Sequence, residues 1–358
     1  MEVLTRDTID FMAKKQLFFD PASIASSLVE LLRWRAMLQP QKVAYRYLVD
    51  GDSAEQTLTY GELDLKARAI AASLQAHYPA GESALLLLSP SLEYVSAFFG
   101  CLYAGMVAVP AEPPSMAKND PALANLRNIV ASASPVVALT GSPFLFKVSA
   151  LTAQVPELAG LRWVATDMVP ERQAARWQDP RSDRDTLALL DFNPDTQSSQ
   201  PVAHGSLLQN AITVQNDFEY NSYSESINWL LPYNGLGLFT GIIQPLFSCS
   251  PVTIMSPLAF RERPARWLEA ITRFRATHSG APAEAYELCA RMVTPEEKAR
   301  LDLRSWVVAF VTTDVESSVS MGLFSGAFAE CGFEPGVFKA GNRLPGWKPA
   351  LALNSQNN

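Results

Sequence analysis

Short apolar runs alternate along this chain with longer stretches in which apolar residues recur at helical spacing. The apolar runs at 84–88, 107–109, 136–140, 187–192 and 252–255 lack the alternating polar positions of a strand with one solvated face. Such strands are typical of parallel sheets that are covered by helices on both faces. The alternation therefore predicts an α/β protein with mostly parallel sheets and right-handed crossovers.

The chain is expected to divide into two lobes. Residues 1–169 are predicted to form a first α/β subdomain with an N-terminal helix and a hairpin, and residues 185–347 a second α/β subdomain. The stretch 170–184 is polar and rich in Arg, Asp and Gln, which is typical of an exposed connection. Residues 348–358 are expected to form a disordered tail.

Several helix starts can be predicted from local motifs. Thr59-Tyr-Gly-Glu62 and Thr294-Pro-Glu-Glu297 each place a glutamate three residues after a threonine, which is a capping box. An earlier helix is predicted to be capped by Ser23, with Ile24, Leu28, Leu31 and Leu32 on one face. A further helix is predicted near Leu236–Leu246.

Composition and charge argue against several classes of partner. The 358 residues are 48% hydrophobic and 18% charged, which is typical of a globular chain. The net charge is −7 and no basic run occurs, so neither nucleic acid nor an anionic membrane is an expected partner. The longest uncharged run, 95–111, contains two glycines and a proline and is too short to span a membrane. Because the first residues lack the pattern of a signal peptide, we expect a cytoplasmic protein.

The cysteines and histidines do not suggest a metal site. The four cysteines are widely spaced without a CxxC pair, and the chain has three histidines, so we expect buried free thiols in a reducing compartment. His204 is interpreted as a structural residue at a helix start, and His278 as a hydrogen-bonded buried histidine rather than a catalyst. Asp314 and Glu316 are interpreted as acids that favour a helix N-terminus.

Four segments carry a resemblance to a known family: Tyr94–Pro110 with Pro113-Pro114, Gln244–Phe260, Arg263–Ile271 joined to Arg275–Gly280, and Ala285–Cys289. They resemble fatty acyl-AMP ligases, which are adenylate-forming enzymes. The resemblance implies a large N-terminal domain of two α/β subdomains and a β-barrel, followed by a small mobile C-terminal domain. Because the chain ends inside that large domain, we expect the barrel and the C-terminal cap to be absent, and the family's catalytic lysine with them.

The resemblance implies an ATP-binding loop after the strand at 187–192. The family carries a Ser/Thr/Gly-rich loop with Pro-Lys-Gly there, because glycines let backbone N–H groups close on phosphates and lysine adds a cation. This chain has a shorter stretch that contains neither glycine nor lysine, so we expect ATP binding to be lost. We interpret the stretch as a solvated strand-to-helix loop. A loop remodelled for a partner or another ligand is the alternative. The degenerate ATP loop consists of Asn193, Asp195, Thr196, Gln197, Ser198, Ser199 and Gln200.

Other positions of the family's site are also replaced. The His and Asp of the family's Trp-Leu-Pro-x-Tyr-His-Asp-Met-Gly-Leu correspond to Asn234 and Gly235, and a glycine of its adenine-binding turn corresponds to Thr312. The family's magnesium-holding glutamate falls in Asn342–Gly346, which contains no carboxylate. The resemblance thus implies a degenerate acyl and adenine pocket made of Trp229, Asn234, Gly235, Ser279, Gly280, Ala281, Thr312 and Asp314.

These replacements favour a catalytically inactive fatty acyl-AMP ligase-like protein. Loss of one positioned donor commonly costs on the order of 10²–10³ in rate, and here several are replaced together. We expect no catalytic residue, no metal and no cofactor, since the ATP and Mg²⁺ of the family are lost. The expected role is a protein-interaction or scaffold module in lipid, polyketide or lipopeptide assembly, bound to a pathway protein or to itself. Two alternatives stay open: a fatty acid or acyl-adenylate binding protein that retains the acyl slot, and a residual fatty acyl-AMP ligase.

Overall fold

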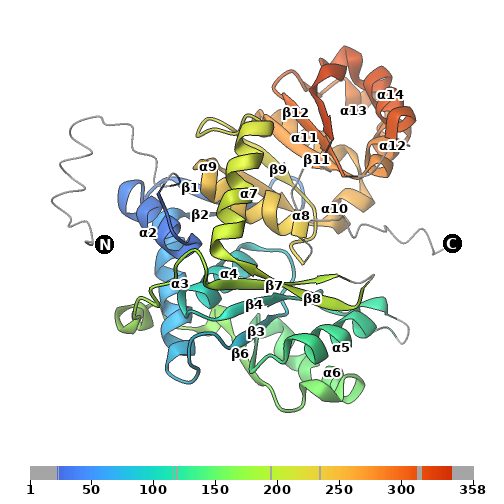
Figure 1. The fold of residues 1–358 in the computed structure, drawn as a ribbon. Coiled ribbons are helices and arrows are strands. Elements are labelled where there is room, and N and C mark those ends of the chain that lie inside the picture. Colours follow the sequence, from blue (N-terminus) through green and yellow to red (C-terminus); the bar gives the residue numbers. More distant parts are fainter. Residues whose placement is uncertain are drawn as a thin grey trace, which may run out of the picture.

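The strands of the chain form two separate sheets, one in the lower and one in the upper half of Figure 1. The predicted α/β architecture, with mostly parallel sheets flanked by helices, is confirmed. The structure is a computed structural model. It describes residues 22, 24–115, 117, 120–193, 196–233, 235–312 and 317–340.

The first sheet has six strands in the order β6-β5-β3-β4-β7-β8. Its neighbours pair in parallel, except β7 and β8, which form an antiparallel hairpin at one edge. The strands are β3 (Ser83–Leu86), β4 (Val107–Pro110), β5 (Val137–Thr140), β6 (Arg162–Ala165), β7 (Leu187–Asn193) and β8 (Ser198–Ala203).

The second sheet has seven strands in the order β13-β12-β11-β9-β10-β1-β2, and β2 is its one antiparallel member. The carboxyl ends of the six parallel strands therefore lie along the same edge of this sheet. The strands are β1 (Val43–Leu48), β2 (Glu55–Thr59), β9 (Ser226–Asn228), β10 (Val252–Met255), β11 (His278–Ala281), β12 (Val308–Val311) and β13 (Phe338–Ala340).

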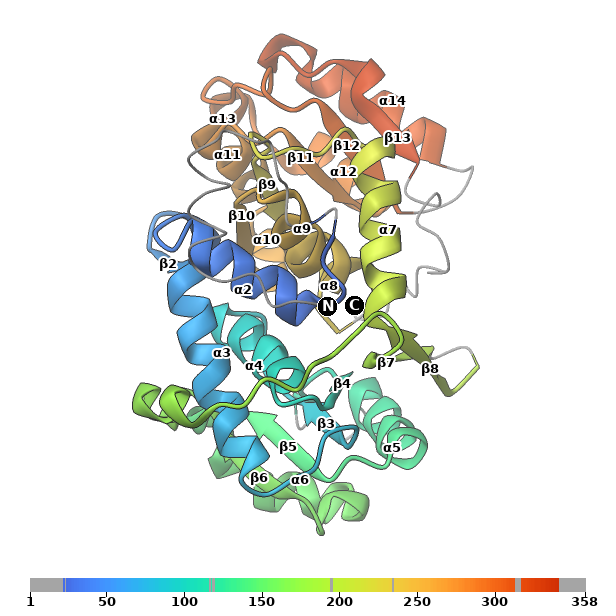
Figure 2. The same ribbon diagram turned by 60° about the vertical axis from the view of Figure 1, so that its left-hand side comes forward.

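Each sheet contains strands from both of the predicted residue ranges. The predicted division of the chain therefore does not match the two sheets. Strands β1 and β2 come from residues 1–169 but belong to the second sheet, where β1 pairs with β10. Strands β7 and β8 come from residues 185–347 but belong to the first sheet, where β7 pairs with β4. The stretch 170–184 thus leads back into the first sheet, and α7 leads from β8 towards the second sheet in both views (Figure 1, Figure 2). Sequential strands are neighbours only roughly two-thirds of the time, so order along the chain does not reveal such an exchange.

Helix α4 explains the long uncharged run, because it contacts strands of both sheets and is almost fully buried. The α-helices are α2 (Leu28–Leu38), α3 (Tyr60–Gln75), α4 (Leu92–Tyr103), α5 (Pro121–Ala133), α6 (Val148–Gln154), α7 (His204–Asp217), α8 (Gly235–Leu238), α9 (Gln244–Ser248), α10 (Pro257–Glu262), α11 (Ala265–Phe274), α12 (Ala283–Met292), α13 (Pro295–Lys298) and α14 (Ser317–Phe328). The other helical turns are η2 (Ser142–Lys147), η3 (Pro156–Leu158), η4 (Thr166–Met168), η5 (Glu171–Arg176), the π-helical η6 (Phe239–Ile243), η7 (Ala329–Cys331) and η8 (Pro335–Val337).

Both predicted capping boxes are confirmed, one before α3 and one before α13. In each box the threonine hydroxyl accepts from the glutamate N–H, and the glutamate carboxylate accepts from the threonine N–H. The start of the first described helix is corrected, because α2 begins at Leu28 and its cap is Ser27, which accepts from the Glu30 N–H at 3.1 Å. Ser23 and the predicted tail at 348–358 lie outside the described residues.

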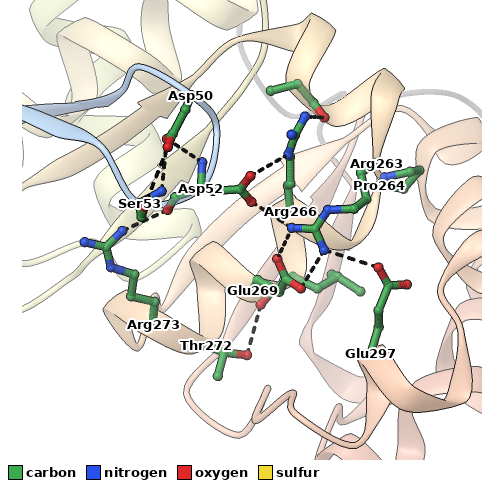
Figure 3. A network of polar contacts seen from close by, with 12 residues as sticks. Asp50, Asp52, Ser53, Arg263, Pro264, Arg266, Glu269, Thr272, Arg273 and Glu297 are labelled. Carbon is green, nitrogen blue, oxygen red and sulfur yellow. Dashed lines mark hydrogen bonds and ion pairs between the residues drawn. The ribbon is translucent and has the colours of Figure 1, made fainter.

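An ion-pair network connects the loop between β1 and β2 to α11 and to Arg263 just before it (Figure 3). The Arg263 guanidinium contacts Asp52 of this loop at 2.7 Å and also Glu269 and Glu297, at 2.6 and 3.2 Å. Arg266 contacts the same Asp52 carboxylate at 3.2 Å. Several carboxylates around Arg263 raise its pKa, and the Glu269 hydrogen bond is the largest cause. The network therefore helps to hold the β1–β2 hairpin on the second sheet, although its side chains are too exposed for a large effect.

The predicted state of the four cysteines is confirmed, because Cys101, Cys249, Cys289 and Cys331 are all free and buried. Within the described ranges, no group of three or more His, Cys, Asp or Glu side chains is placed to hold a metal ion. A search of the same ranges finds no helix with the length and apolar character that a membrane crossing requires.

Candidate functional site

The predicted ATP loop is mostly a tight hairpin. Asn193 at the end of β7 pairs with Ser198 at the start of β8, and Phe192 pairs with Ser199. The prediction of a solvated loop over Asn193–Gln200 is therefore wrong for four of its residues, which belong to strands: Asn193, Ser198, Ser199 and Gln200. Strand β8 contains Pro201 and few β-branched residues, so its sequence gives little indication of a strand, but an edge strand tolerates proline. Asp195 lies outside the described residues.

Polar groups at the tip of this hairpin bond to one another. The Thr196 N–H donates to Asn193 Oδ1 at 3.3 Å, and the Thr196 and Ser198 hydroxyls lie 2.8 Å apart. The Ser199 hydroxyl bonds to the Ser132 hydroxyl of α5 at 2.7 Å. Gln197 is exposed and has a left-handed backbone with φ of 51°. The tip is thus closed by its own side chains and fixed to α5, a contact that the sequence did not reveal.

One half-buried carboxylate lies within the hairpin. Asp191 of β7 pairs with Gln200, and burial raises the pKa of Asp191 to about 6. This side chain is therefore mostly ionised at neutral pH. A negative charge beside the hairpin repels an approaching phosphate rather than attracting it.

Trp229 lies directly after β9, at the carboxyl edge of the second sheet. Its ring stacks on Phe260 with centroids 4.1 Å apart and meets Trp267 edge-on at 5.8 Å. Trp229 is buried, and its Nε1 atom has no hydrogen-bond partner within the described part of the chain. An unpaired buried N–H costs about 1–3 kcal/mol and therefore calls for an explanation such as a ligand or water.

The neighbouring strand β11 contributes Ser279, Gly280 and Ala281, all buried. The Ser279 hydroxyl donates to the Ile227 carbonyl at 2.7 Å and accepts from Trp267 Nε1 at 2.8 Å, so it is fully engaged in the core. A Cβ at Gly280 would lie 2.1 Å from the Phe310 ring, which explains the glycine. The Ala281 carbonyl accepts from the Thr312 N–H at 3.3 Å.

Thr312 follows β12 on the other side of β11 and is 3% exposed. Its Oγ1 atom is a second buried polar atom without a hydrogen-bond partner in the described ranges. Trp229 and Thr312 therefore stand at the ends of β9 and β12, with the end of β11 between them. Asn234 and Asp314, which were predicted to belong to this pocket, lie outside the described residues, as do Glu316 and Asn342–Gly346.

The segment that begins at Gly235 is not the regular helix predicted near Leu236–Leu246. It consists of α8, the π-helical turn η6 and α9. A Cβ at Gly237 would lie 1.9 Å from the Leu231 carbonyl oxygen, and a Cβ at Gly241 would lie 1.9 Å from Asn228 Nδ2. Wide turns of this kind are frequent at functional sites. The glycine spacing of the sequence could have indicated the close approach, but not the π-helical geometry.

The turn before α8 also joins the two lobes. The Tyr94 hydroxyl of α4 donates to the Pro232 carbonyl at 2.9 Å, and its ring meets the Tyr233 ring edge-on at 5.8 Å. Figure 1 and Figure 2 place α8 on the side of the second sheet that faces the β7–β8 hairpin. The two parts of the candidate site thus belong to different sheets, and α4 connects them.

Both histidines near the site have structural surroundings, as predicted. His204 begins α7, and its Nδ1 accepts from the Leu28 N–H at 3.3 Å. His278 bonds through Nε2 to the Phe218 carbonyl at 2.8 Å and through Nδ1 to the Thr277 hydroxyl at 2.7 Å. Burial lowers the pKa of each imidazole to about 4. Both rings are therefore neutral at pH 7 and neither is poised as a general base.

Comparisons with known proteins agree with this fold. A family model described as AMP-binding enzyme matches residues 32–328. JamA of Moorena producens (strain JHB), a medium-chain-fatty-acid–[acyl-carrier-protein] ligase, is 37% identical over 86% of this chain and 53% of its own length. FadD32 of Mycolicibacterium smegmatis, a long-chain-fatty-acid–AMP ligase, is 28% identical over 92% of this chain and 53% of its own length.

Comparison with solved structures also finds this fold. A fatty acyl-adenylate ligase from Legionella pneumophila, crystallised with acyl adenylate and pyrophosphate, superposes with a TM-score of 0.82 at 33% identity. The match covers 88% of this chain and 55% of that one. The adenylation domain of a keto acid-selecting peptide synthetase module, at 19% identity and a TM-score of 0.79, shares the fold.

The share of each relative that is covered limits what can be transferred. The chain spans about half the length of the curated relatives it matches. Over that half, the four segments that suggested the resemblance lie within the matched residues. The chain belongs to the AMP-binding enzyme family, and the proteins that it is similar to include fatty acyl-adenylate and fatty-acid ligases.

Proposed function

We propose that this chain does not form acyl adenylates and acts by binding a protein partner in lipid, polyketide or lipopeptide assembly. One observation carries the proposal: the residues that the resemblance aligns with the family's phosphate-binding loop form a hairpin whose polar groups bond to one another. The relatives named above are ligases, so the proposal concerns a change of role within the family.

ATP and Mg²⁺ do not fit the residues that are present. A triphosphate requires several free N–H groups and a cation, and catalysis requires these donors to be held in place beforehand. The Thr196 N–H donates to a side chain of the hairpin, and the Ser199 hydroxyl bonds to α5. Residues 193–200 contain no glycine and no lysine. We therefore derive no chemical step through bound ATP.

The partner class follows from the chemistry of a relative. JamA is named for transfer to an acyl carrier protein, and we propose such a carrier protein as the partner of this chain. An apolar surface on α12 and α14 suits a protein partner. We call it the α12–α14 face, and it consists of the exposed side chains Leu288, Met292, Val319 and Leu323.

Two further features support this surface. Ser320 bonds to Glu287 at 3.1 Å, which joins the two helices beside the exposed side chains. Helix α14 contains no charged residue, although Val319 is 69% exposed. Burying a Val, Leu or Met side chain stabilises a complex by roughly 1.5–3 kcal/mol, so a few of them support specific binding.

The test combines a reaction assay with a binding assay. We expect no pyrophosphate release from ATP with a medium-chain fatty acid, and saturable calorimetric binding of a purified acyl carrier protein. Leu323→Glu should weaken that binding at least about tenfold, because a charge would be buried at the interface. Phe146→Glu, at an exposed apolar residue of the other lobe, is the matched control and should leave it unchanged. Pyrophosphate release that requires both ATP and the fatty acid would instead favour a residual ligase.

A second candidate function is fatty acyl binding. The unpaired Trp229 Nε1 and Thr312 Oγ1 atoms favour it, because buried polar atoms at strand carboxyl ends suit a ligand with hydrogen-bond acceptors. A fatty acid that binds the folded chain should raise its melting temperature. We would compare decanoate on the unaltered chain and on Trp229→Phe, which keeps the aromatic stacking and removes the N–H donor. An equal rise in melting temperature for the unaltered chain and for Trp229→Phe, or no rise in either, would count against fatty acyl binding.

A further inference from the structure

We propose that Asn228 is a positioning residue for Trp229, the residue on which the second candidate function depends. Trp229 Nε1 is buried and has no hydrogen-bond partner among the residues that the structure describes. Asn228 directly precedes it as the last residue of β9 and is 4% exposed. The ligand at this site rests on the second candidate function, whereas the role of Asn228 can also be tested without a ligand.

Two hydrogen bonds fix the Asn228 amide. Its Nδ2 donates to the Gly237 carbonyl of α8 at 3.2 Å, and its Oδ1 accepts from the Leu230 N–H at 3.2 Å. These partners set the orientation of the amide, because one is an acceptor and the other a donor. Leu230 follows Trp229, so the bond to Leu230 closes a short turn around Trp229. One buried amide thus joins this turn to the helical segment that begins at Gly235.

The space for this amide is built into the helical segment at Gly241. A Cβ at Gly241 would lie 1.9 Å from Asn228 Nδ2. Because the amide is buried and bonded on both sides, it cannot turn away without losing a hydrogen bond. Helix propensity disfavours glycine inside a helix, and the contact with Asn228 gives a reason for it. The helical segment and the amide therefore fit together as a pair.

Side-chain donors also reach the carbonyls that precede the π-helical turn η6. Asn228 Nδ2 donates to the Gly237 carbonyl, and the Thr240 hydroxyl donates to the Leu236 carbonyl at 2.8 Å. A π-helical turn interrupts the regular hydrogen-bond ladder of an α-helix, and inserted side chains are a common cause of such interruptions. Asn228 thus helps to stabilise the wide turn, and loss of its amide is expected to change both η6 and the turn around Trp229.

Trp229 needs such positioning, because its ring contacts do not fix its backbone. The ring stacks on Phe260 and meets Trp267 edge-on, and these contacts are apolar. The hydrogen bond from Leu230 to Asn228 supplies a directional constraint. A donor that is held in place before binding gives tighter binding, because less conformational entropy is lost when the ligand arrives. Asn228 is therefore expected to affect ligand binding without touching the ligand.

The first experiment measures this positioning in the full chain without a ligand. Indole ¹H–¹⁵N NMR spectra are recorded, and the Trp229 signal is identified as the one that is absent from Trp229→Phe. We expect one sharp Trp229 signal in the unaltered chain. Asn228→Ala should broaden or split it and leave the other indole signals in place, because the turn around Trp229 loses its fixed geometry. A sharp, unshifted Trp229 signal in Asn228→Ala would overturn the proposal.

Thr240→Val is the matched control, because it removes the other buried side-chain donor of this segment without a contact to the Trp229 turn. Its Trp229 signal should stay sharp. Equal broadening in Thr240→Val and Asn228→Ala would mean that any loosening of the helical segment disturbs Trp229, and Asn228 would lose its special role. Circular dichroism would check that both variants are folded.

A double variant separates positioning from packing. Gly241→Ala alone should lower the melting temperature, because its Cβ would meet the Asn228 amide. Asn228→Ala combined with Gly241→Ala should recover most of that loss, since alanine at position 228 leaves room for the new Cβ. The Trp229 signal of the double variant should nevertheless stay broadened. If its signal were as sharp as that of the unaltered chain, Asn228 would only fill space.

The second experiment connects Asn228 to binding. The rise in melting temperature that decanoate causes in the unaltered chain should fall by at least half in Asn228→Ala, although the Trp229 N–H is still present. An equal rise in both would overturn the role of Asn228 in binding. No rise in the unaltered chain would instead count against fatty acyl binding, and the NMR comparison would still decide whether Asn228 positions Trp229.

Discussion

The β7–β8 hairpin and the carboxyl edge of the second sheet differ in how their polar groups are satisfied. At the hairpin, the hydroxyls of Thr196, Ser198 and Ser199 all bond to other side chains. At the second sheet, Trp229 Nε1 and Thr312 Oγ1 are buried and unpaired within the residues that the structure describes. The hydroxyls of the hairpin thus bond to one another or to α5, whereas the carboxyl edge of the second sheet still has groups that a ligand could satisfy.

The two regions also differ in their glycines. The hairpin stretch 193–200 has none, whereas Gly237, Gly241 and Gly280 leave no room for a Cβ. Close packing of backbone and side chains therefore persists around the second sheet. The second sheet is thus closely packed around its glycines, whereas β7 and β8 form an ordinary hairpin. Four predictions test this difference.

The largest expected effect is the loss of stability in acid. The pKa values of His204 and His278 are lowered from 6.5 to about 4 by burial, so folding favours the neutral rings. The neutral rings make their full contribution to the free energy of unfolding above pH 6.5. This contribution is lost as the pH falls towards 4, by roughly 3 kcal/mol for each histidine. Urea unfolding at a series of pH values between 7 and 4 would measure this slope.

Asp191 is the control of opposite sign. Its pKa is raised from 3.8 to about 6, so its ionisation disfavours the folded chain as the pH rises through 6. Asp191→Asn should therefore stabilise the chain at pH 7, on the order of 1–2 kcal/mol. His278→Gln should flatten the acid slope by about half, because one of the two histidines is removed. A slope that is unchanged in His278→Gln would contradict the assignment.

The second prediction concerns the packing of β11. Gly280→Val should destabilise the chain by about 3 kcal/mol, because the new side chain would meet the Phe310 ring. Chemical denaturation would measure the change. Gly322→Ala is the control, because the space beyond Gly322 on α14 is open, and it should stabilise the helix by about 1 kcal/mol. If Gly280→Val were tolerated, close packing would not be the reason for the glycine.

The third prediction tests the unpaired hydroxyl of Thr312. Thr312→Val should raise the free energy of unfolding by about 1 kcal/mol, because it replaces an unsatisfied buried hydroxyl with a methyl group of similar size. Thr140→Val is the matched control. The Thr140 hydroxyl is equally buried but donates to the Leu87 carbonyl at 2.8 Å, so its loss should cost about 1 kcal/mol. Equal effects at both positions would mean that Thr312 has a partner after all.

The smallest effect is expected at the tip of the hairpin. Gln197 has a left-handed backbone, which glycine adopts without the strain of a side chain. Gln197→Gly should therefore stabilise the chain by about 0.5 kcal/mol after the entropy of glycine in the unfolded chain is counted. Gln200→Gly, in the extended strand β8, should destabilise by about 0.5–1 kcal/mol. Thermal unfolding of both variants would reveal whether the tip has the turn described here.

Local motifs of the sequence predicted local structure well. The capping boxes at Thr59 and Thr294 and the buried strands at 84–88, 107–109, 136–140 and 252–255 were correct, because each depends on a few neighbouring residues. The strand at 187–192 is present but only partly buried. The sheets to which β1 and β7 belong were not predicted, because they depend on pairing between distant segments. The π-helical turn η6 and the unpaired Trp229 N–H were not predictable, since both arise from packing around them. The protein partner and the cytoplasmic location stay predictions.

The central claim is that the chain lacks the means to hold the phosphates of ATP. Calorimetric titration of the full chain with ATP and Mg²⁺ tests it most directly. We expect no saturable heat at ligand concentrations up to about 1 mM, where even binding worth ~4 kcal/mol becomes detectable. Saturable binding with a Kd in the micromolar range, lost when the terminal phosphates are removed, would contradict it.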